Sequence, residues 1–338
     1  MKGAVLHGPG DVRYDDIEDP TPGPGEIVVR TLAAFSCGTD LKVVRRGYHA
    51  KMLTPPCVFG HEGAGEVAAI GDGVASFRVG DLVVAANSAP CGTCRQCARN
   101  RLSLCEDLVF WNGTFAEAYR VPARVVDNNV LKLDGVRPED AAMTEPLACC
   151  VKGVDDAGVR AQDRVLVIGA GSIGLMLAKL CSLRGASVTA VARRPESLPA
   201  MKAQGAGTTA ELRVFEGRVD LPDAKTRFDV VFDAAGSRET AGLALRSADI
   251  GGVVSLFAGC PAGTVIELDA TKAHYEETRI LGSFHHTPAS FREAFRLIRE
   301  GEIQPASFIT ARSTLRDLPA ALTSPPPGTL KTLVTFGN

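Results

Sequence analysis

The chain has 338 residues, more than one hydrophobic core usually serves, so we expect about two domains. Its 37 basic and 39 acidic side chains give a net charge of −2, which argues against a nucleic-acid partner and a polybasic membrane anchor and favours a small, near-neutral one. Although 45% of the residues are hydrophobic, no apolar run has the length of a signal peptide or a membrane span, so we expect a cytoplasmic protein.

Short β-strands are predicted for residues 1–151. Glycine and proline divide this segment into brief β-branched runs, such as EIVVRTL at 26–32 and GDLVVAA at 80–86. Runs of this length between turn residues are typical of strands joined by tight connections. The first domain is therefore predicted to be rich in β-structure.

Four cysteines follow one another within the 15 residues from Cys91 to Cys105. Four thiolates match a closed tetrahedral zinc site, which leaves no position for water or substrate and so predicts a structural rather than a catalytic metal. An iron–sulfur cluster and four unligated thiols are the alternatives, and the polar character of the segment disfavours the second. The predicted ligands are Cys91, Cys94, Cys97 and Cys105.

A parallel α/β domain is predicted for residues 152–285. The segment 163–194 contains an apolar strand, a glycine turn, an amphipathic helix and a second strand, which together form a βαβ unit. Three further buried strands are predicted within 228–236, 251–259 and 278–284, at separations that allow crossover helices. After them, 288–303 predicts a helix, and 329–336 predicts a strand that returns residues 286–338 to the first domain.

A dinucleotide-binding turn is predicted directly after the first strand of that domain. The glycines of G-x-G-x-x-G let the backbone approach a pyrophosphate at a helix N-terminus, whereas the alternative is a tight turn without a ligand. The motif consists of Gly169, Gly171, Ser172, Ile173 and Gly174.

The end of the next strand indicates which cofactor is bound. It carries Arg193 and Arg194 where an acidic residue would bind the ribose hydroxyls of NAD. Two guanidinium groups suit a 2′-phosphate, so NADP(H) is predicted over NAD(H). The alternative is a solvated surface pair.

Four dispersed residues become interpretable only through a family resemblance. Cys37, the His61–Glu62 pair and Glu145 lie too far apart for spacing alone to make them a site. However, GHEGAGEV at 60–67, the four-cysteine loop, EPLACC at 145–150 and GAGSIG at 169–174 occur in an order that closely resembles the zinc-dependent medium-chain dehydrogenases/reductases. The polyol, sugar and threonine dehydrogenase branch is nearer than the liver-type alcohol dehydrogenases.

The resemblance covers essentially the whole chain and implies an α/β protein with two domains. These are a GroES-like β-rich catalytic domain and a Rossmann domain with a doubly wound parallel sheet. It also implies two zinc ions per chain: one held by the four-cysteine loop, the other by Cys37, His61 and either Glu62 or Glu145, with a water or substrate oxygen completing the shell.

Further roles follow from the same resemblance. Asp40 would orient the ligands of the catalytic zinc, and the hydroxyl of Thr39 would begin a proton relay. Lys42 stands where many relatives carry the next relay histidine, so the path would run through water or Glu62, or Lys42 would simply face solvent. Lys331 matches a basic position near the cofactor phosphates.

Substrate contacts are the least determined part of the sequence. His285 and His286 replace an Arg-Tyr pair that contacts the polyol in sorbitol dehydrogenases, so they are predicted to bind substrate hydroxyls or else to be loop histidines without a ligand. The segment Phe110–Phe115, with the single tryptophan, is predicted either to line the pocket or to pack in the core.

The predicted activity is hydride transfer between NADP(H) and a secondary alcohol or ketone of a polyol, sugar, cyclitol or amino-alcohol. The alternatives are a zinc-independent quinone or enoyl reductase, which would lack the ligand set, and a regulatory or structural NADP(H)-binding protein without catalysis. Relatives are commonly dimers or tetramers, so a homodimer or homotetramer is expected.

Overall fold

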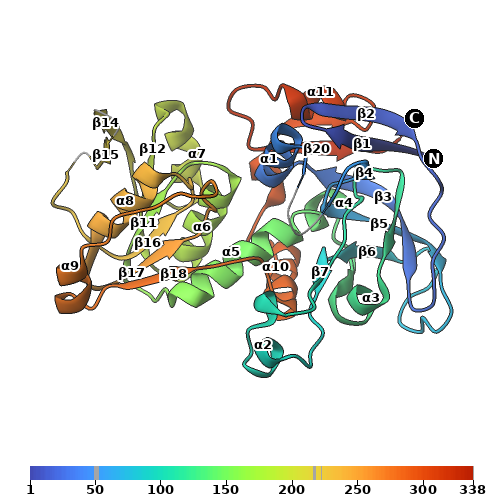
Figure 1. The fold of residues 1–338 in the computed structure, drawn as a ribbon, viewed down its shortest axis with the longest axis horizontal. Coiled ribbons are helices and arrows are strands. Elements are labelled where there is room, and N and C mark those ends of the chain that lie inside the picture. Colours follow the sequence, from blue (N-terminus) through green and yellow to red (C-terminus); the bar gives the residue numbers. More distant parts are fainter. Residues whose placement is uncertain (49–52, 216–217, 222, 338) are drawn as a thin grey trace. The chain divides into compact units, whose positions relative to one another are not determined.

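The chain divides into two units, shown in Figure 1. The computed structural model describes residues 1–48, 53–215, 218–221 and 223–337. Unit 1 comprises Met1–Ala148 and His286–Asn338, and unit 2 comprises Cys149–His285. The first boundary therefore falls inside helix α5 (Thr144–Ala157), a little before the residue 151 expected from the sequence. Among the described residues, no helix combines the length and the hydropathy that crossing a membrane requires.

Unit 1 is built on a seven-stranded sheet whose long strands β3 and β5 are largely buried. The last strand of the chain, β20, pairs antiparallel with β3, so Leu333 lies opposite Phe35. This pairing places the C-terminal strand in unit 1. The order is β10 (Val130–Lys132), β6 (Leu82–Ala85), β5 (Glu62–Ile70), β3 (Ile27–Phe35), β20 (Lys331–Thr335) and β19 (Ile309–Thr314), with β9 (Ala118–Val121) also on β3.

Smaller sheets and short helices surround that sheet within unit 1. The longest of these helices is α10, which buries one apolar face that includes Phe291, Phe295 and Ile298. The sheets are β2 (Asp11–Asp16), β1 (Lys2–Gly8) and β4 (Cys57–Val58), and β7 (Ser88–Ala89) with β8 (Val109–Phe110). The helices are α1 (Gly38–Arg46), α2 (Arg95–Ala98), α3 (Ala123–Asn129), α4 (Pro138–Ala141), α10 (Pro288–Arg299) and α11 (Leu318–Thr323).

Unit 2 contains the predicted parallel sheet. Its order is β13 (Thr208–Glu211), β12 (Ser187–Ala192), β11 (Arg164–Ile168), β16 (Phe228–Asp233), β17 (Ala248–Leu256) and β18 (Arg279–Gly282), and every neighbouring pair is parallel. The strand order reverses between β11 and β16, which is where open α/β sheets bind nucleotides. Besides the C-terminal part of α5, the α-helices are α6 (Ser172–Leu183), α7 (Leu198–Ala203), α8 (Arg238–Ser247) and α9 (Ala270–Tyr275).

Candidate active site

Three of the dispersed residues meet at one end of the large sheet of unit 1. The ligand atoms of Cys37, His61 and Glu62 all lie within 4.8 Å of one another. The reason is strand pairing: Phe35 at the end of β3 lies opposite Glu62 at the start of β5, so residues far apart in the sequence become neighbours. A thiol, an imidazole and a carboxylate in one cluster match the donor set of a catalytic zinc site, which uses three protein ligands and leaves one position open.

Asp40 connects two members of this cluster. Its carboxylate accepts a hydrogen bond from the backbone N–H of Cys37 at 2.7 Å, and its Oδ1 lies 3.4 Å from Nδ1 of His61. Burial alone would lower the pKa of His61, but the nearby Asp40 carboxylate raises that pKa well above its ordinary value. Because Nδ1 faces Asp40, Nε2 is the ring nitrogen left for a metal ion.

Lys331 belongs to this cluster and not to a cofactor phosphate site. Its ammonium forms an ion pair with both carboxylate oxygens of Glu62, and both side chains are at most 1% exposed. Glu62 raises the pKa of Lys331 against the opposing effect of burial, so the lysine stays charged. The predicted contact between Lys331 and the cofactor phosphates is therefore wrong, because the ammonium is enclosed in unit 1 beside the candidate metal ligands.

Glu145 lies at the start of α5 and is outside the 4.8 Å group that Cys37, His61 and Glu62 form among the described residues. Its carboxylate is 6% exposed, and burial raises its pKa to about 7. It remains close enough to His61 for their charges to interact. Of the two glutamates predicted as ligands, Glu62 is thus the one grouped with Cys37 and His61.

The two predicted substrate histidines have different surroundings. His286 is only 2% exposed, and its Nε2 lies 2.9 Å from Oδ1 of Asn87 and 4.0 Å from Oε1 of Glu145. Burial lowers the pKa of His286 to about 3, so this imidazole is neutral. His285 lies at the end of unit 2, partly exposed, with a left-handed φ of 60°. His286 is therefore adjacent to Glu145 and has little exposed surface that a substrate could contact.

Asn87 is a site residue that the sequence did not reveal. It follows β6 and is 1% exposed. The backbone carbonyl of Asn87 accepts a hydrogen bond from the backbone N–H of Trp111 at 3.0 Å, which fixes the position of Asn87. The only available signal was a polar residue at the end of a buried strand, and its partner lies 199 residues away.

The remaining predictions near this site concern α1 and the tryptophan segment. Thr39 is partly buried in the first turn of α1. Lys42 is exposed, as expected if it faces solvent and does not replace the relay histidine. Trp111 stacks on Tyr119 with ring centroids 4.9 Å apart and donates its indole N–H to the carbonyl of Ala86. Trp111 is therefore part of the core of unit 1.

The four cysteines of residues 91–105 converge as the sequence predicts. Their sulfur atoms lie within 4.8 Å of one another, at 4.0 Å for Cys91–Cys97 and 3.9 Å for Cys94–Cys105, and none is in a disulfide. A zinc tetrahedron with bonds of about 2.3 Å has sulfur–sulfur edges of about 3.8 Å. Hydrogen bonds from Thr93 lower the pKa of Cys91 to about 6, which favours the thiolate. The loop fits a closed zinc site.

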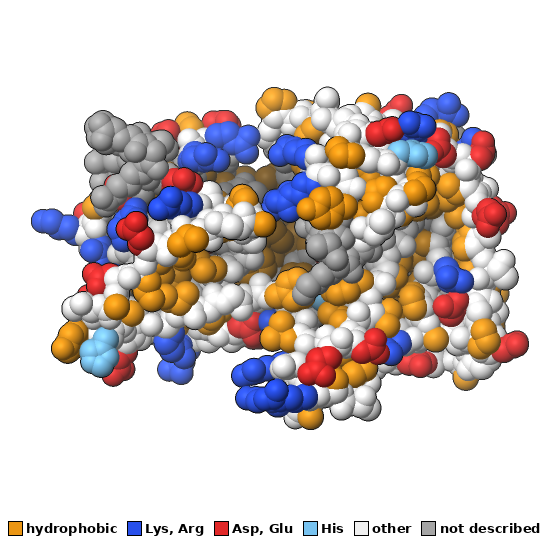
Figure 2. All heavy atoms as spheres, viewed as in Figure 1, with side chains coloured by type: hydrophobic (Ala, Val, Ile, Leu, Met, Phe, Trp, Pro, Cys, Tyr) orange, Lys and Arg blue, Asp and Glu red, His pale blue; other side chains and the backbone are white. Residues whose placement is uncertain are grey.

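The outer surface of this loop is basic. Arg95, Arg99 and Arg101 are exposed, and Figure 2 shows basic side chains gathered over α2. The four sulfurs face each other on the inside, with Cys97 and Cys105 buried. This separation of a charged exterior from an enclosed sulfur cluster agrees with a structural metal.

The glycine motif of unit 2 borders a cavity of about 600 Å³. Gly169, Gly171, Arg193 and Arg194 are among the residues that line it. Gly174 has no room for a side chain, because a Cβ there would lie 1.9 Å from the carbonyl oxygen of Gly169. The cavity thus joins a phosphate-binding helix N-terminus to two guanidinium groups.

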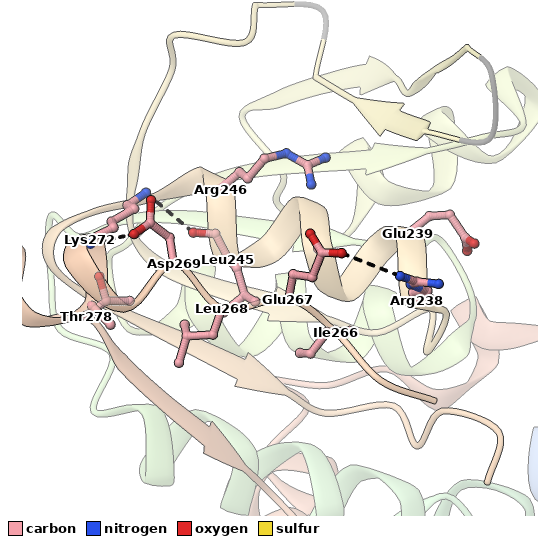
Figure 3. A pocket seen from close by; sticks show the side chains of 12 residues that line it. Arg238, Glu239, Leu245, Arg246, Ile266, Glu267, Leu268, Asp269, Lys272 and Thr278 are labelled. Atoms are coloured by element: carbon pink, nitrogen blue, oxygen red, sulfur yellow. Dashed lines mark hydrogen bonds and ion pairs between the residues drawn. The ribbon is translucent and has the colours of Figure 1, made fainter. Parts of the chain in front are cut away.

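A second cavity of unit 2, of about 790 Å³, lies between α8 and residues 266–278 (Figure 3). Its charged side chains are of both signs, and Arg238 pairs with Glu267 at 3.9 Å. Asp269 accepts a hydrogen bond from the backbone N–H of Lys272 at 3.0 Å and so caps α9. This cavity contains none of the predicted site residues.

Comparison with known proteins shows that the chain is similar to zinc-binding dehydrogenases and to polyol dehydrogenases. Residues 23–132 match the family model described as alcohol dehydrogenase GroES-like domain, and residues 172–300 match the one described as zinc-binding dehydrogenase. Sorbitol dehydrogenase of Bombyx mori is 31% identical over 94% of this chain and 93% of its own length. D-altritol 5-dehydrogenase of Agrobacterium fabrum is 32% identical over 91% of each chain.

Solved structures show the same similarity. A zinc-binding dehydrogenase from Sinorhizobium meliloti 1021, solved with bound NADP, superimposes with a TM-score of 0.90 at 30% identity over 99% of both chains. Similarity over the full length means that both units, and not one alone, have counterparts in that protein.

Proposed function

The chain belongs to the zinc-binding alcohol dehydrogenase family, and from this premise we propose that it transfers a hydride between NADP(H) and a secondary alcohol or ketone of a polyol, sugar, cyclitol or amino-alcohol. The observation that carries the proposal is the cluster of Cys37, His61 and Glu62 in unit 1. The substrate class is supported by the relatives named above and by L-threonine 3-dehydrogenase of Pyrococcus horikoshii, which is 30% identical over 87% of this chain.

We propose that the chain holds two zinc ions. Cys91, Cys94, Cys97 and Cys105 would hold the structural one, and Cys37 and His61, with Glu62 or Glu145, the catalytic one. Bound there, zinc supplies Lewis-acid chemistry, which acidifies an alcohol or polarises a carbonyl. Lys331 would offset the charge of Glu62 and so lower the net negative charge of the ligand set, and Asp40, which lies beside Nδ1 of His61, would leave Nε2 for the metal.

The hydroxyl of Thr39 is proposed to receive the alcohol proton. Thr39 lies two residues after Cys37, in the first turn of α1 and partly buried. Because Lys42 is exposed one turn later, water would accept the proton beyond Thr39. His286, neutral and bonded to Asn87, would support Glu145 and not carry the proton itself.

The preference for NADP(H) is proposed to depend on Arg193 and Arg194. Arg193→Asp should raise the KM for NADP⁺ by about 10–100-fold, because a charge-assisted hydrogen bond contributes about 1.5–3 kcal/mol, and should lower the KM for NAD⁺. Steady-state kinetics with both cofactors measures the change. Arg227→Asp is the control, since Arg227 bonds to nearby backbone carbonyls and lies outside the cavity. Unchanged KM values for both cofactors would contradict the assignment.

A substrate screen tests the function as a whole. Polyols, aldoses, cyclitols and amino-alcohols are assayed with NADP⁺ and NAD⁺, and zinc is counted by elemental analysis. Reduction of NADP⁺ by at least one class, with two zinc ions per chain, is expected. One zinc and no turnover would favour a regulatory or structural protein, and reduction of quinones or enoyl substrates without zinc would favour the other alternative.

A homodimer or homotetramer is proposed to form through the exposed edge of the sheet of unit 2. The edge strand β18 carries Ile280, which is 39% exposed, and its outer backbone groups have no strand beside them among the described residues. A second copy could satisfy both by antiparallel pairing about a two-fold axis. Ile280→Lys should raise the dissociation constant of the oligomer at least tenfold, as measured by analytical ultracentrifugation. A wild-type chain that sediments as a monomer would contradict the proposal.

A further inference from the structure

Asp233 organises the turn that follows β16. It is the last residue of that strand and is fully buried. Its Oδ1 accepts hydrogen bonds from the backbone N–H groups of Ala235 at 3.0 Å and Gly236 at 3.2 Å. The backbone N–H of Ala234 is bonded to the carbonyl of Ile168 at 2.9 Å. One side chain therefore fixes a turn whose first residue is tied to β11.

This turn forms one wall of the cavity that carries the glycine motif. Ala234 and Ala235 line it together with Gly169. The packing is close, because a Cβ on Gly169 would lie 3.2 Å from both Ala234 C and Ala235 N. The carbonyl of Asp233 also accepts from the N–H groups of Phe257 and Ala258 after β17, at 3.2 and 2.9 Å. Asp233 thus joins the ends of three strands at the edge of the sheet that binds nucleotides.

The second carboxylate oxygen does not contribute to the hydrogen bonds that fix the turn. Oδ2 of Asp233 is buried and has no hydrogen-bond partner among the described residues. A buried polar atom without a partner destabilises a fold, and an apolar side chain of similar size would avoid that penalty. Packing therefore does not explain a carboxylate here, whereas the two bonds from Oδ1 to the turn do.

We propose that Asp233 is a positioning residue for the dinucleotide: it holds the backbone of 234–236 in the shape that the cofactor requires. The inference rests on the proposed function, because it assumes that the cavity binds NADP(H). A turn that is already fixed loses no conformational freedom on binding, so the carboxylate increases affinity without touching the cofactor.

Cofactor affinity measured without catalysis tests this role. Dissociation constants for NADPH and for adenosine 2′,5′-bisphosphate are measured by calorimetry on the full chain. Asp233→Leu, which removes the acceptor, should raise both constants about tenfold. Asp233→Asn, which keeps an oxygen acceptor, should leave them within about twofold of wild type. If the leucine variant does not fold, Asp233→Ser, polar but too short to reach both N–H groups, replaces it.

Asp269→Ala is the matched control. Asp269 is another carboxylate of unit 2 that accepts a backbone N–H, but it lies at the second cavity (Figure 3). The Asp269→Ala variant should have a lower melting temperature than wild type and unchanged dissociation constants for NADPH and the bisphosphate. The inference is overturned if Asp233→Leu behaves in the same way, or if Asp233→Asn loses as much affinity as Asp233→Leu.

The wild-type measurement separates this inference from the proposed function. If the wild-type chain binds none of NADPH, NADH and the bisphosphate, the proposed function is wrong, and this inference is wrong with it. A wild-type chain that binds NADH alone overturns only the cofactor preference, and the same comparison of Asp233 variants with NADH then decides the role of Asp233.

Discussion

His61→Ala is expected to lower kcat at least about 10³-fold and to remove the zinc ion proposed for the cluster of Cys37, His61 and Glu62. His61 supplies the imidazole of the ligand cluster in unit 1, and no other histidine belongs to that cluster among the described residues. Lewis-acid catalysis contributes several kcal/mol to the transition state, and each 1.36 kcal/mol corresponds to a factor of ten. Elemental analysis and steady-state kinetics with the best substrate of the screen measure both effects.

His7→Ala is the control for that variant. His7 lies in the same unit, with its Nε2 hydrogen-bonded to Oδ2 of Asp15 at 2.7 Å, and it belongs to none of the candidate metal clusters. It should keep two zinc ions and full activity. If His61→Ala also keeps two zinc ions and turns over at the wild-type rate, the cluster of Cys37, His61 and Glu62 is not the catalytic centre.

Cys94→Ser is expected to destabilise the protein by several kcal/mol while leaving substrate choice unchanged. Its sulfur lies 3.9 Å from that of Cys105 in the closed four-thiolate loop, so the variant should lose the structural zinc. Binding of a structural zinc contributes directly to folding stability. Because 1 kcal/mol shifts Tm by about 2–4 °C in a domain of this size, a decrease of roughly 10 °C is expected. Calorimetry measures it.

The loop and the catalytic cluster can be separated with a second cysteine. Cys57 is partly buried on β4 and belongs to neither cluster, so Cys57→Ser should change Tm by only a few degrees and retain both zinc ions. At assay temperatures below the Tm of the variant, Cys94→Ser should have the same ratio of kcat/KM values for two alcohols as wild type. A changed ratio at an unchanged Tm would assign the loop to catalysis and refute its structural role.

Features encoded by nearby residues were predictable. The glycine motif and the four-cysteine loop each lie within one short segment, so spacing indicates the chemistry, and the structure brings those residues together as expected. Five of the six strands of the parallel sheet were also predicted, because buried strands of this kind are continuous apolar runs, whereas the partly exposed edge strand β13 was not predicted. The C-terminal strand, predicted from a short apolar run, lies in the first unit and pairs with β3.

Features that depend on long-range pairing were not predictable from spacing. Cys37, His61 and Glu62 meet because β3 pairs with β5, and only the family resemblance indicated them in advance. Lys331 was assigned to the cofactor because its charge suits a phosphate, yet its partner is Glu62, 269 residues away. The residues next to a charged side chain in the sequence do not indicate which residue it pairs with in the folded protein.

The sequence by itself determined the two-unit α/β architecture, the closed metal loop and the nucleotide motif, since each arises from local periodicity or from ligands on one segment. Only the tertiary structure decided that Lys331 pairs with Glu62, that Asn87 contacts His286 and that Asp233 accepts a backbone N–H of the turn beside the glycine motif. The physical reason is burial. A polar group removed from water must find its partner wherever the packed chain provides one, and that place is set by the fold.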